Sequence, residues 1–288
     1  MPTANINGIA INYETHGSGP PLLMLAPGGF ESTIEKWSTA GVWPPVRPLE
    51  IFAKRYTVIA YDRREAGHSG GRVERLSWRL YADEAKGLLE RLGHDKAFVL
   101  GACMGCTVAL AFGVAYPESV LGLVLHYPVG GALWRINMRK RFADHAAFAE
   151  ERGLEEIVRV ARGEAALFQT NAAGGPWGAV IAQDEGFAKS FAAQDLDRYV
   201  ALVRTLGPSM FDRDTAPGVE PEELMALKMP SVIIPGDDPA HATSGARYLK
   251  ECLADSVYHD VPPDGQKPEM LTDWILSFLD AHAPTVVG

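Results

Sequence analysis

The chain has 288 residues, 47% of them hydrophobic and 22% charged, which is typical of a globular protein. This length allows one large α/β domain or one domain with a sizeable insertion, and a core of that size needs no disulfide or structural metal. The net charge of −9 argues against a nucleic-acid partner, and no apolar run approaches the roughly 20 residues of a membrane span. The three cysteines lack framework spacing, and the first residues show neither a charged n-region nor an apolar h-region. These features predict a cytoplasmic protein in a reducing compartment.

Short apolar runs alternate with amphipathic helices along most of the chain, which predicts a mostly parallel sheet. Residues 5–13 read as a hairpin around an Asn-Gly turn. The predicted strands that follow are 22–26, 56–61, 97–100, 120–126, 231–235 and 256–261. Residues 129–218 break this rhythm and read as several helices, so we expect a helical cap there and an α/β core formed by 1–128 and 219–288.

A candidate nucleophile lies where the third predicted parallel strand meets a helix. The sequence Gly-Ala-Cys-Met-Gly at 101–105 is the G-x-S-x-G nucleophile elbow with sulfur in place of the hydroxyl. The elbow would expose the Cys103 thiol above the carboxyl edge of the sheet, where ligands bind in open parallel sheets. A helix N-terminus favours the thiolate and lowers the cysteine pKa. Cys103 is therefore the predicted reactive residue.

Together with three further motifs, the elbow makes nearly the whole chain resemble the α/β-hydrolase family. Residues 25–30 (Leu-Ala-Pro-Gly-Gly-Phe) resemble the oxyanion loop, residues 61–70 a D-x-R-G-x-G-x-S stretch with Glu65 in place of a glycine, and residues 230–239 the loop that carries the catalytic acid. The resemblance implies an α/β-hydrolase fold with a mostly parallel central sheet and an inserted helical cap. It also implies oxyanion donors at the backbone N–H of Gly29 (or Phe30) and of Met104, and a catalytic acid at Asp238, with Asp237 as the alternative.

The sequence departs from this family where a histidine normally follows the last strand. Gln266 occupies that place, and a glutamine cannot carry a proton between reactants. His259 is expected inside the last strand and so offers no replacement. His241, three residues after Asp238, is the first choice as the catalytic imidazole, ahead of two other strand-end histidines, His126 and His68.

Other side chains are candidates for pocket walls rather than for chemistry. They are Phe30, His126, Tyr127, Trp134, Trp177 and Gln266. Cys106, one helical turn after Cys103, is expected to be a structural thiol rather than a redox partner. No metal-ligand spacing and no dinucleotide or phosphate-loop pattern is present, so neither a metal nor a cofactor is expected.

Three functions are compatible with these residues. The first is a cofactor-independent hydrolase or acyl transferase that attacks an ester, lactone, thioester or activated C–C bond through Cys103. The second is a lyase or cyclase that stabilises an enolate without a covalent intermediate. The third is a binding protein that has lost turnover. Each implies a small-molecule partner and neither nucleic acid nor membrane, and a homodimer is left open.

Overall fold

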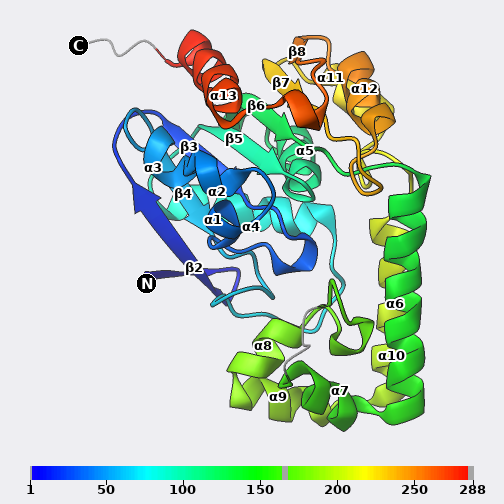
Figure 1. Ribbon diagram of the computed structural model, residues 1–288. Helices are drawn as coiled ribbons and strands as arrows, with labels where there is room; N and C mark the ends of the chain where they lie inside the picture. The colour runs from blue at the N-terminus through cyan, green and yellow to red at the C-terminus, as the bar shows by residue number, and fades with distance from the viewer. Residues whose placement is uncertain (1, 164–167, 285–288) are drawn as a thin grey trace.

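The computed structural model describes residues 2–163 and 168–284, which form an α/β fold around one eight-stranded sheet (Figure 1). The strand order is β1-β2-β4-β3-β5-β6-β7-β8, and the strands from β4 to β8 run parallel while β1 and β2 pair antiparallel at one end. Their bounds are β1 Thr3–Ile6, β2 Ile9–His16, β3 Pro21–Leu25, β4 Thr57–Tyr61, β5 Ala97–Ala102, β6 Val120–His126, β7 Ser231–Ile234 and β8 Ser256–Tyr258. The predicted fold class is confirmed.

The central strand β5 shows why the sheet is covered on both faces. All six of its residues are buried, and they alternate between two hydrophobic clusters. Phe98, Leu100 and Ala102 enter one cluster, and Ala97 and Val99 enter the other. A strand buried on both faces reads as a continuous apolar run, because each side chain meets a helix layer.

Helices form the two layers. One cluster includes buried residues of α4, α5, α11 and α12, and the other includes those of α1, α2, α3 and α13. The bounds are α1 Lys36–Thr39, α2 Trp43–Val46, α3 Pro48–Phe52, α4 Trp78–Arg91, α5 Gly105–Ala115, α11 Pro221–Ala226, α12 Thr243–Cys252 and α13 Pro268–His282. Helix α4 begins directly after Ser77, whose hydroxyl caps it by accepting the Leu80 N–H at 3.1 Å.

Strand β8 is shorter than predicted. It ends at Tyr258, so the expectation that His259 lies within the strand is wrong. The sequence continues as Asp260, Val261 and two prolines, and a proline has no N–H for the ladder. The His259 ring instead stacks on Trp274 of α13, with 4.1 Å between ring centroids.

Between β6 and α11, the described residues include five α-helices, which form what we call the helical insertion. They are α6 Ala132–Arg152, α7 Leu154–Ala161, α8 Gly178–Gln183, α9 Glu185–Ala192 and α10 Leu196–Met210. The long helices α6 and α10 pack along each other, and α7, α8 and α9 gather at their far end (Figure 1). Phe142 of α6 contacts Phe30 in the loop after β3, with 5.4 Å between centroids. The insertion therefore packs on the edge of the sheet where the parallel strands end.

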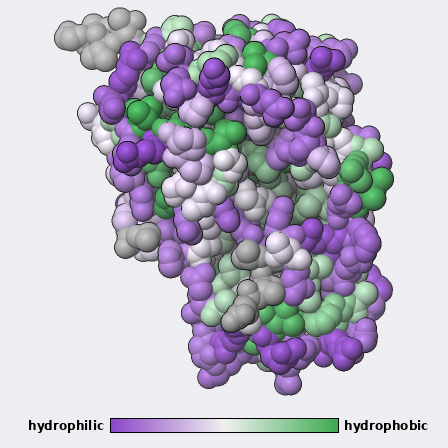
Figure 2. All heavy atoms as spheres, in the orientation of Figure 1, coloured by the Kyte–Doolittle hydropathy of each residue, from purple (hydrophilic) through white to green (hydrophobic). Residues whose placement is uncertain are grey.

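Among the described residues, no helix is long and apolar enough to cross a membrane. On the face drawn in Figure 2, hydrophilic residues prevail, and the hydrophobic ones form separate patches. Leu133 and Ile136 of α6 are among the exposed large hydrophobic side chains.

Candidate active site

Cys103 occupies a sharp turn between β5 and α5. Its φ of 56° lies in the left-handed region, which is unusual for a residue with a side chain. The Cys103 N–H donates to the carbonyl of His126 at the end of β6, over 3.0 Å, which fixes the turn on the neighbouring strand. The strained turn leaves the thiol at the wall of a cavity rather than in the core.

The two glycines of the elbow have a packing reason. A Cβ on Gly101 would lie 2.5 Å from the carbonyl oxygen of Gly105, and a Cβ on Gly105 would lie 2.2 Å from the carbonyl oxygen of Leu25. Helix α5 thus starts against the backbone of β3, and any larger residue would force the two elements apart. The G-x-C-x-G spacing follows from this close approach.

The loop after β7 places a histidine and a carboxylate beside the elbow. Asp238 closes a tight turn, because its Oδ1 accepts the N–H of Ala240 at 2.7 Å and of His241 at 3.1 Å. Its other oxygen, Oδ2, lies 2.7 Å from Nδ1 of His241. Gly236 makes room for the imidazole, since a Cβ there would come within 2.5 Å of the His241 Cβ. A carboxylate three residues before the histidine therefore orients the ring locally.

His241 and Cys103 alter each other's protonation. Burial alone would lower the pKa of His241, but the hydrogen-bonding and charge of Cys103, followed by those of Asp238, raise it to about 9. Burial alone would raise the pKa of Cys103, but His241 and the N–H groups of Met104 and Gly28 lower it below the ordinary value. Each group thus stabilises the charged form of the other, the thiolate of Cys103 and the imidazolium of His241.

The Nε2 atom of His241 is buried and makes no ordinary hydrogen bond to the residues that the structure describes. Its coupling to Cys103 therefore acts across a longer separation than that to Asp238. Catalytic hydrogen bonds often shorten only once a substrate is bound. The nitrogen is thus free to exchange a proton with a group that enters beside the sulfur.

Two backbone amides interact with the sulfur. The N–H of Met104 comes from the start of the elbow, and that of Gly28 comes from the loop after β3. Gly28 has a φ of 112° and Gly29 a φ of 64°, so both adopt backbone that favours glycine. The Gly29 carbonyl accepts a hydrogen bond from Nη2 of Arg63 at 2.9 Å, which anchors the loop from below. The amide of this loop that interacts with the sulfur is thus that of Gly28, whereas the sequence predicted Gly29 or Phe30; the predicted Met104 amide does interact with it.

The thiol opens into a cavity of about 200 Å³. His126, Tyr127 and His241 line it together with Pro27, Gly28, Ala102 and the segment from Ala40 to Trp43. Of the pocket residues predicted from sequence, His126 and Tyr127 lie on its wall. The contribution of Trp43 was missed. The sequence held one signal for this segment: the Trp-Pro-Pro run at 43–45, since proline in the first turn of a helix is typical of a helix start. That signal predicts a short helix but not its place beside the cavity.

The other predicted pocket residues lie elsewhere. Trp134 packs on Phe211 with 5.1 Å between centroids, and Trp177 donates its Nε1–H to the carbonyl of Arg72 at 2.8 Å. Phe30 lines a separate cavity of about 200 Å³ between the core and the helical insertion, with Glu65 on its wall. None of these side chains lines the Cys103 cavity.

Gln266, in the place of the usual histidine, is buried in a structural position. Its side-chain amide donates to the carbonyls of Pro235 and Val261 at 2.8 and 2.7 Å. It thereby joins the loop after β7 to the loop after β8. His68 is exposed and lies in another hollow with Asn12 and Asp62, so it does not line the Cys103 cavity either.

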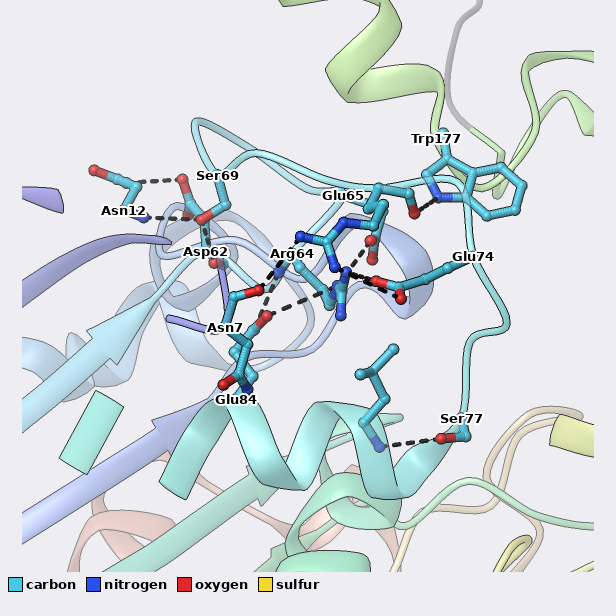
Figure 3. Close-up of polar contacts among 12 residues, drawn as sticks. Asn7, Asn12, Asp62, Arg64, Glu65, Ser69, Glu74, Ser77, Glu84 and Trp177 are labelled. Carbon is cyan, nitrogen blue, oxygen red and sulfur yellow. Dashed lines mark hydrogen bonds and ion pairs between the residues drawn. The ribbon is translucent and has the colours of Figure 1, made fainter. Parts of the chain in front are cut away.

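Glu65, which the sequence left unexplained, belongs to a buried charged network (Figure 3). Its Oε1 accepts a bond from Nε of Arg64 at 2.9 Å, and Arg64 also reaches Glu74 and Glu84. Burial raises the pKa of Glu65 to about 7 despite the two neighbouring arginines. Burial and the charge of Glu65 raise the pKa of Glu84 to about 8. The network lies under the loops after β4 and supports them from inside the fold.

The remaining thiols and acids give no sign of another chemistry within residues 2–163 and 168–284. Cys106 is buried, its Sγ lies 3.1 Å from the carbonyl oxygen of Gly101, and burial raises its pKa well above the ordinary value. The three cysteines are free. Across these residues, no group of three or more histidine, cysteine or acidic side chains could hold a metal ion.

Comparison with known proteins identifies the fold family. The alpha/beta hydrolase fold family matches residues 21–203, more than half of the chain, so the chain belongs to this family. The uncharacterized hydrolase YraK of Bacillus subtilis (strain 168) is 29% identical over 131 residues, which cover 44% of this chain and 44% of YraK. The matched part is thus less than half of that relative.

Two solved structures share the fold over almost the full chain. A meta-cleavage product hydrolase from Pseudomonas fluorescens IP01 superposes with a TM-score of 0.62 at 17% identity and covers 98% of both chains. The enol-lactonase from Burkholderia xenovorans LB400 gives a TM-score of 0.62 at 18% identity, covering 97% of this chain and 100% of the other. At these identities the likeness establishes the fold and leaves the chemistry to the residues.

Proposed function

We propose that this protein is a cofactor-independent hydrolase or acyl transferase in which Cys103 attacks an ester, thioester, lactone or activated C–C bond. The observation that carries the proposal is the coupling of the elbow thiol to His241, which is itself bonded to Asp238. A nucleophile and a base on one cavity, with an acid that orients the base, are the parts of a covalent catalytic triad. The histidine comes from the acid loop, so the triad does not need one at position 266.

In the proposed reaction the Cys103 thiolate adds to the substrate carbonyl and forms a C–S bond. The negative charge moves to the carbonyl oxygen, where the Met104 N–H and an N–H of the Gly28–Gly29 loop stabilise it. Such a donor is worth roughly 3–4 kcal/mol of barrier. The His241 imidazolium then gives its proton to the leaving group as the bond to that group breaks, which yields a thioester on Cys103.

The second half of the reaction returns the enzyme to its starting state. Neutral His241 takes a proton from water or from an acceptor alcohol, and the resulting oxygen nucleophile attacks the thioester. The same amides receive the charge, and the sulfur leaves as a thiolate beside the newly formed imidazolium. We propose that the helical insertion (residues 129–218 in the predicted domain division) acts as a cap that limits access of water and of large substrates.

Three variants test the proposal with a panel of p-nitrophenyl esters, thioesters and lactones. Cys103→Ala should abolish turnover, and His241→Gln should lower kcat/KM by about 100- to 10,000-fold, the usual contribution of a general acid–base group. His16→Gln is the matched control, because His16 forms another histidine–carboxylate pair, with Glu14 at 2.9 Å, on the exposed end of β2. It should leave turnover unchanged.

Two results would redirect the interpretation. Turnover that survives Cys103→Ala would favour a lyase or cyclase that uses the pocket without a covalent intermediate. Saturable binding of these compounds without turnover would favour a binding protein. A cytoplasmic location and the assembly state remain predictions.

A further inference from the structure

The wall of the Cys103 cavity carries a second imidazole, that of His126, which the proposed reaction does not use. His126 ends β6, and its backbone carbonyl accepts the N–H of Cys103 at 3.0 Å and lies 3.3 Å from Sγ of Cys106. Its position is therefore set by the same contacts that hold the elbow. His126 is one of the residues that line the cavity into which the nucleophile opens.

The His126 ring is held between two aromatic side chains. It stacks on Tyr127, with centroids 4.1 Å apart and an interplanar angle of 10°, and it meets Trp43 edge-on at 4.7 Å. The residue is only 2% exposed. Its Nε2 nevertheless makes no hydrogen bond to any residue that the structure describes. A buried polar atom without a partner is destabilising, and a ligand that supplies a partner would recover that free energy.

The ring is neutral under all ordinary conditions. Burial, followed by the charge of His241, lowers the pKa of His126 to about 3. A neutral imidazole cannot pair with a carboxylate, but it can form one hydrogen bond through Nε2 as donor or as acceptor, depending on the tautomer. A hydroxyl group satisfies either tautomer, because it both donates and accepts.

The size of the cavity limits the size of the ligand group that bears this hydroxyl. Its volume of about 200 Å³ is below the roughly 300–1,000 Å³ of sites for larger ligands. Apart from Cys103, the two histidines and Tyr127, its lining residues are apolar or small: Pro27, Gly28, Ala40, Gly41, Val42, Trp43 and Ala102. Such a cavity suits a short, mostly apolar group of a few carbon atoms attached to the carbonyl that Cys103 attacks.

We propose that His126 makes this enzyme selective for short hydroxyacyl groups, whose hydroxyl bonds to Nε2 while the carbonyl lies at Cys103. The inference rests on the proposed function, since it assigns the acyl side of that site. It places His126 in substrate recognition and not in proton transfer.

The test compares esters that differ only in one group. The substrates are p-nitrophenyl 2-hydroxybutanoate and 3-hydroxybutanoate, each beside the isostere in which a methyl group replaces the hydroxyl. Wild-type protein should show a kcat/KM about tenfold higher for at least one hydroxy ester than for its methyl partner, the value of one added hydrogen bond of roughly 1.4 kcal/mol. A ratio of one or less for both pairs would overturn the inference even if Cys103-dependent turnover is robust.

Variants of His126 separate the hydrogen bond from the shape of the wall. His126→Phe keeps a ring without Nε2, so the ratio should fall to about one. His126→Gln places an amide near the position of Nε2 and should retain part of the preference, whereas the shorter His126→Asn should not. Equal ratios in wild type, the glutamine variant and the asparagine variant would contradict the assignment.

A binding measurement decides the inference independently of catalysis. In Cys103→Ala, which cannot form the thioester, the affinities of 3-hydroxybutanamide and 3-methylbutanamide are measured by NMR titration. The hydroxy amide should bind about tenfold more tightly, and this difference should vanish when His126→Phe is added. If wild type turns over no ester, the proposed function fails, and equal binding of the two amides would then reject the recognition site as well.

Discussion

Replacing His241 with glutamine is the most informative perturbation of the ground state, because it removes the positive partner of the thiolate without leaving a cavity. The pKa of His241, about 9, stands roughly 2.5 units above the ordinary 6.5, and at about 1.36 kcal/mol per unit this represents on the order of 3 kcal/mol. Part of this comes from Asp238, whose side chain is 51% exposed and therefore partly screened by solvent. The share that belongs to Cys103 predicts a thiolate population about 10- to 100-fold smaller in His241→Gln at neutral pH.

The assay is the rate of alkylation by iodoacetamide between pH 5 and 10, with the modified cysteine identified by peptide mass. In wild type, Cys103 should react faster than Cys106 or Cys252, and its rate should rise at a pH below that of a free thiol. In His241→Gln the same rise should move to higher pH, because burial still disfavours the thiolate and only the backbone amides oppose it. His16→Gln should match wild type. A profile in His241→Gln that coincides with that of wild type would refute the ion pair.

Three further outcomes are expected. Activity should fall as pH rises through about 9, since His241 then loses the proton that it gives to the leaving group; a pH–kcat/KM profile that stays level to pH 10.5 would contradict this. In denaturant titrations, Gly105→Ala should lower the free energy of unfolding by about 1–3 kcal/mol, because its Cβ would lie 2.2 Å from the Leu25 carbonyl oxygen. Gly113→Ala, in the same helix, meets only ordinary contacts at 3.5 Å and should raise the free energy of unfolding by about 0.5–1 kcal/mol. The raised pKa of Glu84 means that its protonated form contributes stability, which is complete below pH 4.5 and is lost as pH rises through about 8. Between pH 5 and 9, Glu84→Gln should therefore lose less stability than wild type. Parallel curves of unfolding free energy against pH for the two proteins would exclude this role.

The sequence could predict the fold because its signals are local and repeat. Apolar runs at strand length, helices between them and the glycines of the elbow each have a direct backbone or packing cause, such as the contact of Gly105 with β3. The pairing of Asp238 with His241 was accessible for the same reason, since three residues separate them within one turn. Because the Asp238 carboxylate accepts hydrogen bonds from the backbone of its own turn, the His241 ring at the end of that turn must lie close to it.

The walls of the cavity could not be predicted in this way. Trp43 reaches the site from a short helix whose path depends on packing against α13, and nothing near it in sequence indicates that path. Trp134 and Trp177 were predicted to be pocket walls, but both pack elsewhere. Trp134 packs on Phe211, and Trp177 hydrogen-bonds to the Arg72 carbonyl of the core. Side chains far apart in sequence are assigned to a cavity only by the tertiary fold, which periodicity does not encode.

The central claim is that Cys103 forms a covalent acyl intermediate, and trapping that intermediate tests it most directly. Wild-type protein is mixed with a short p-nitrophenyl ester, quenched in acid within milliseconds to seconds, and analysed by intact and peptide mass. We predict one added acyl group on the peptide that contains Cys103, with increased occupancy in His241→Gln if deacylation slows more than acylation, and no adduct in Cys103→Ala. Release of p-nitrophenol with no acyl group on Cys103 at any time, and at an equal rate in Cys103→Ala, would contradict it.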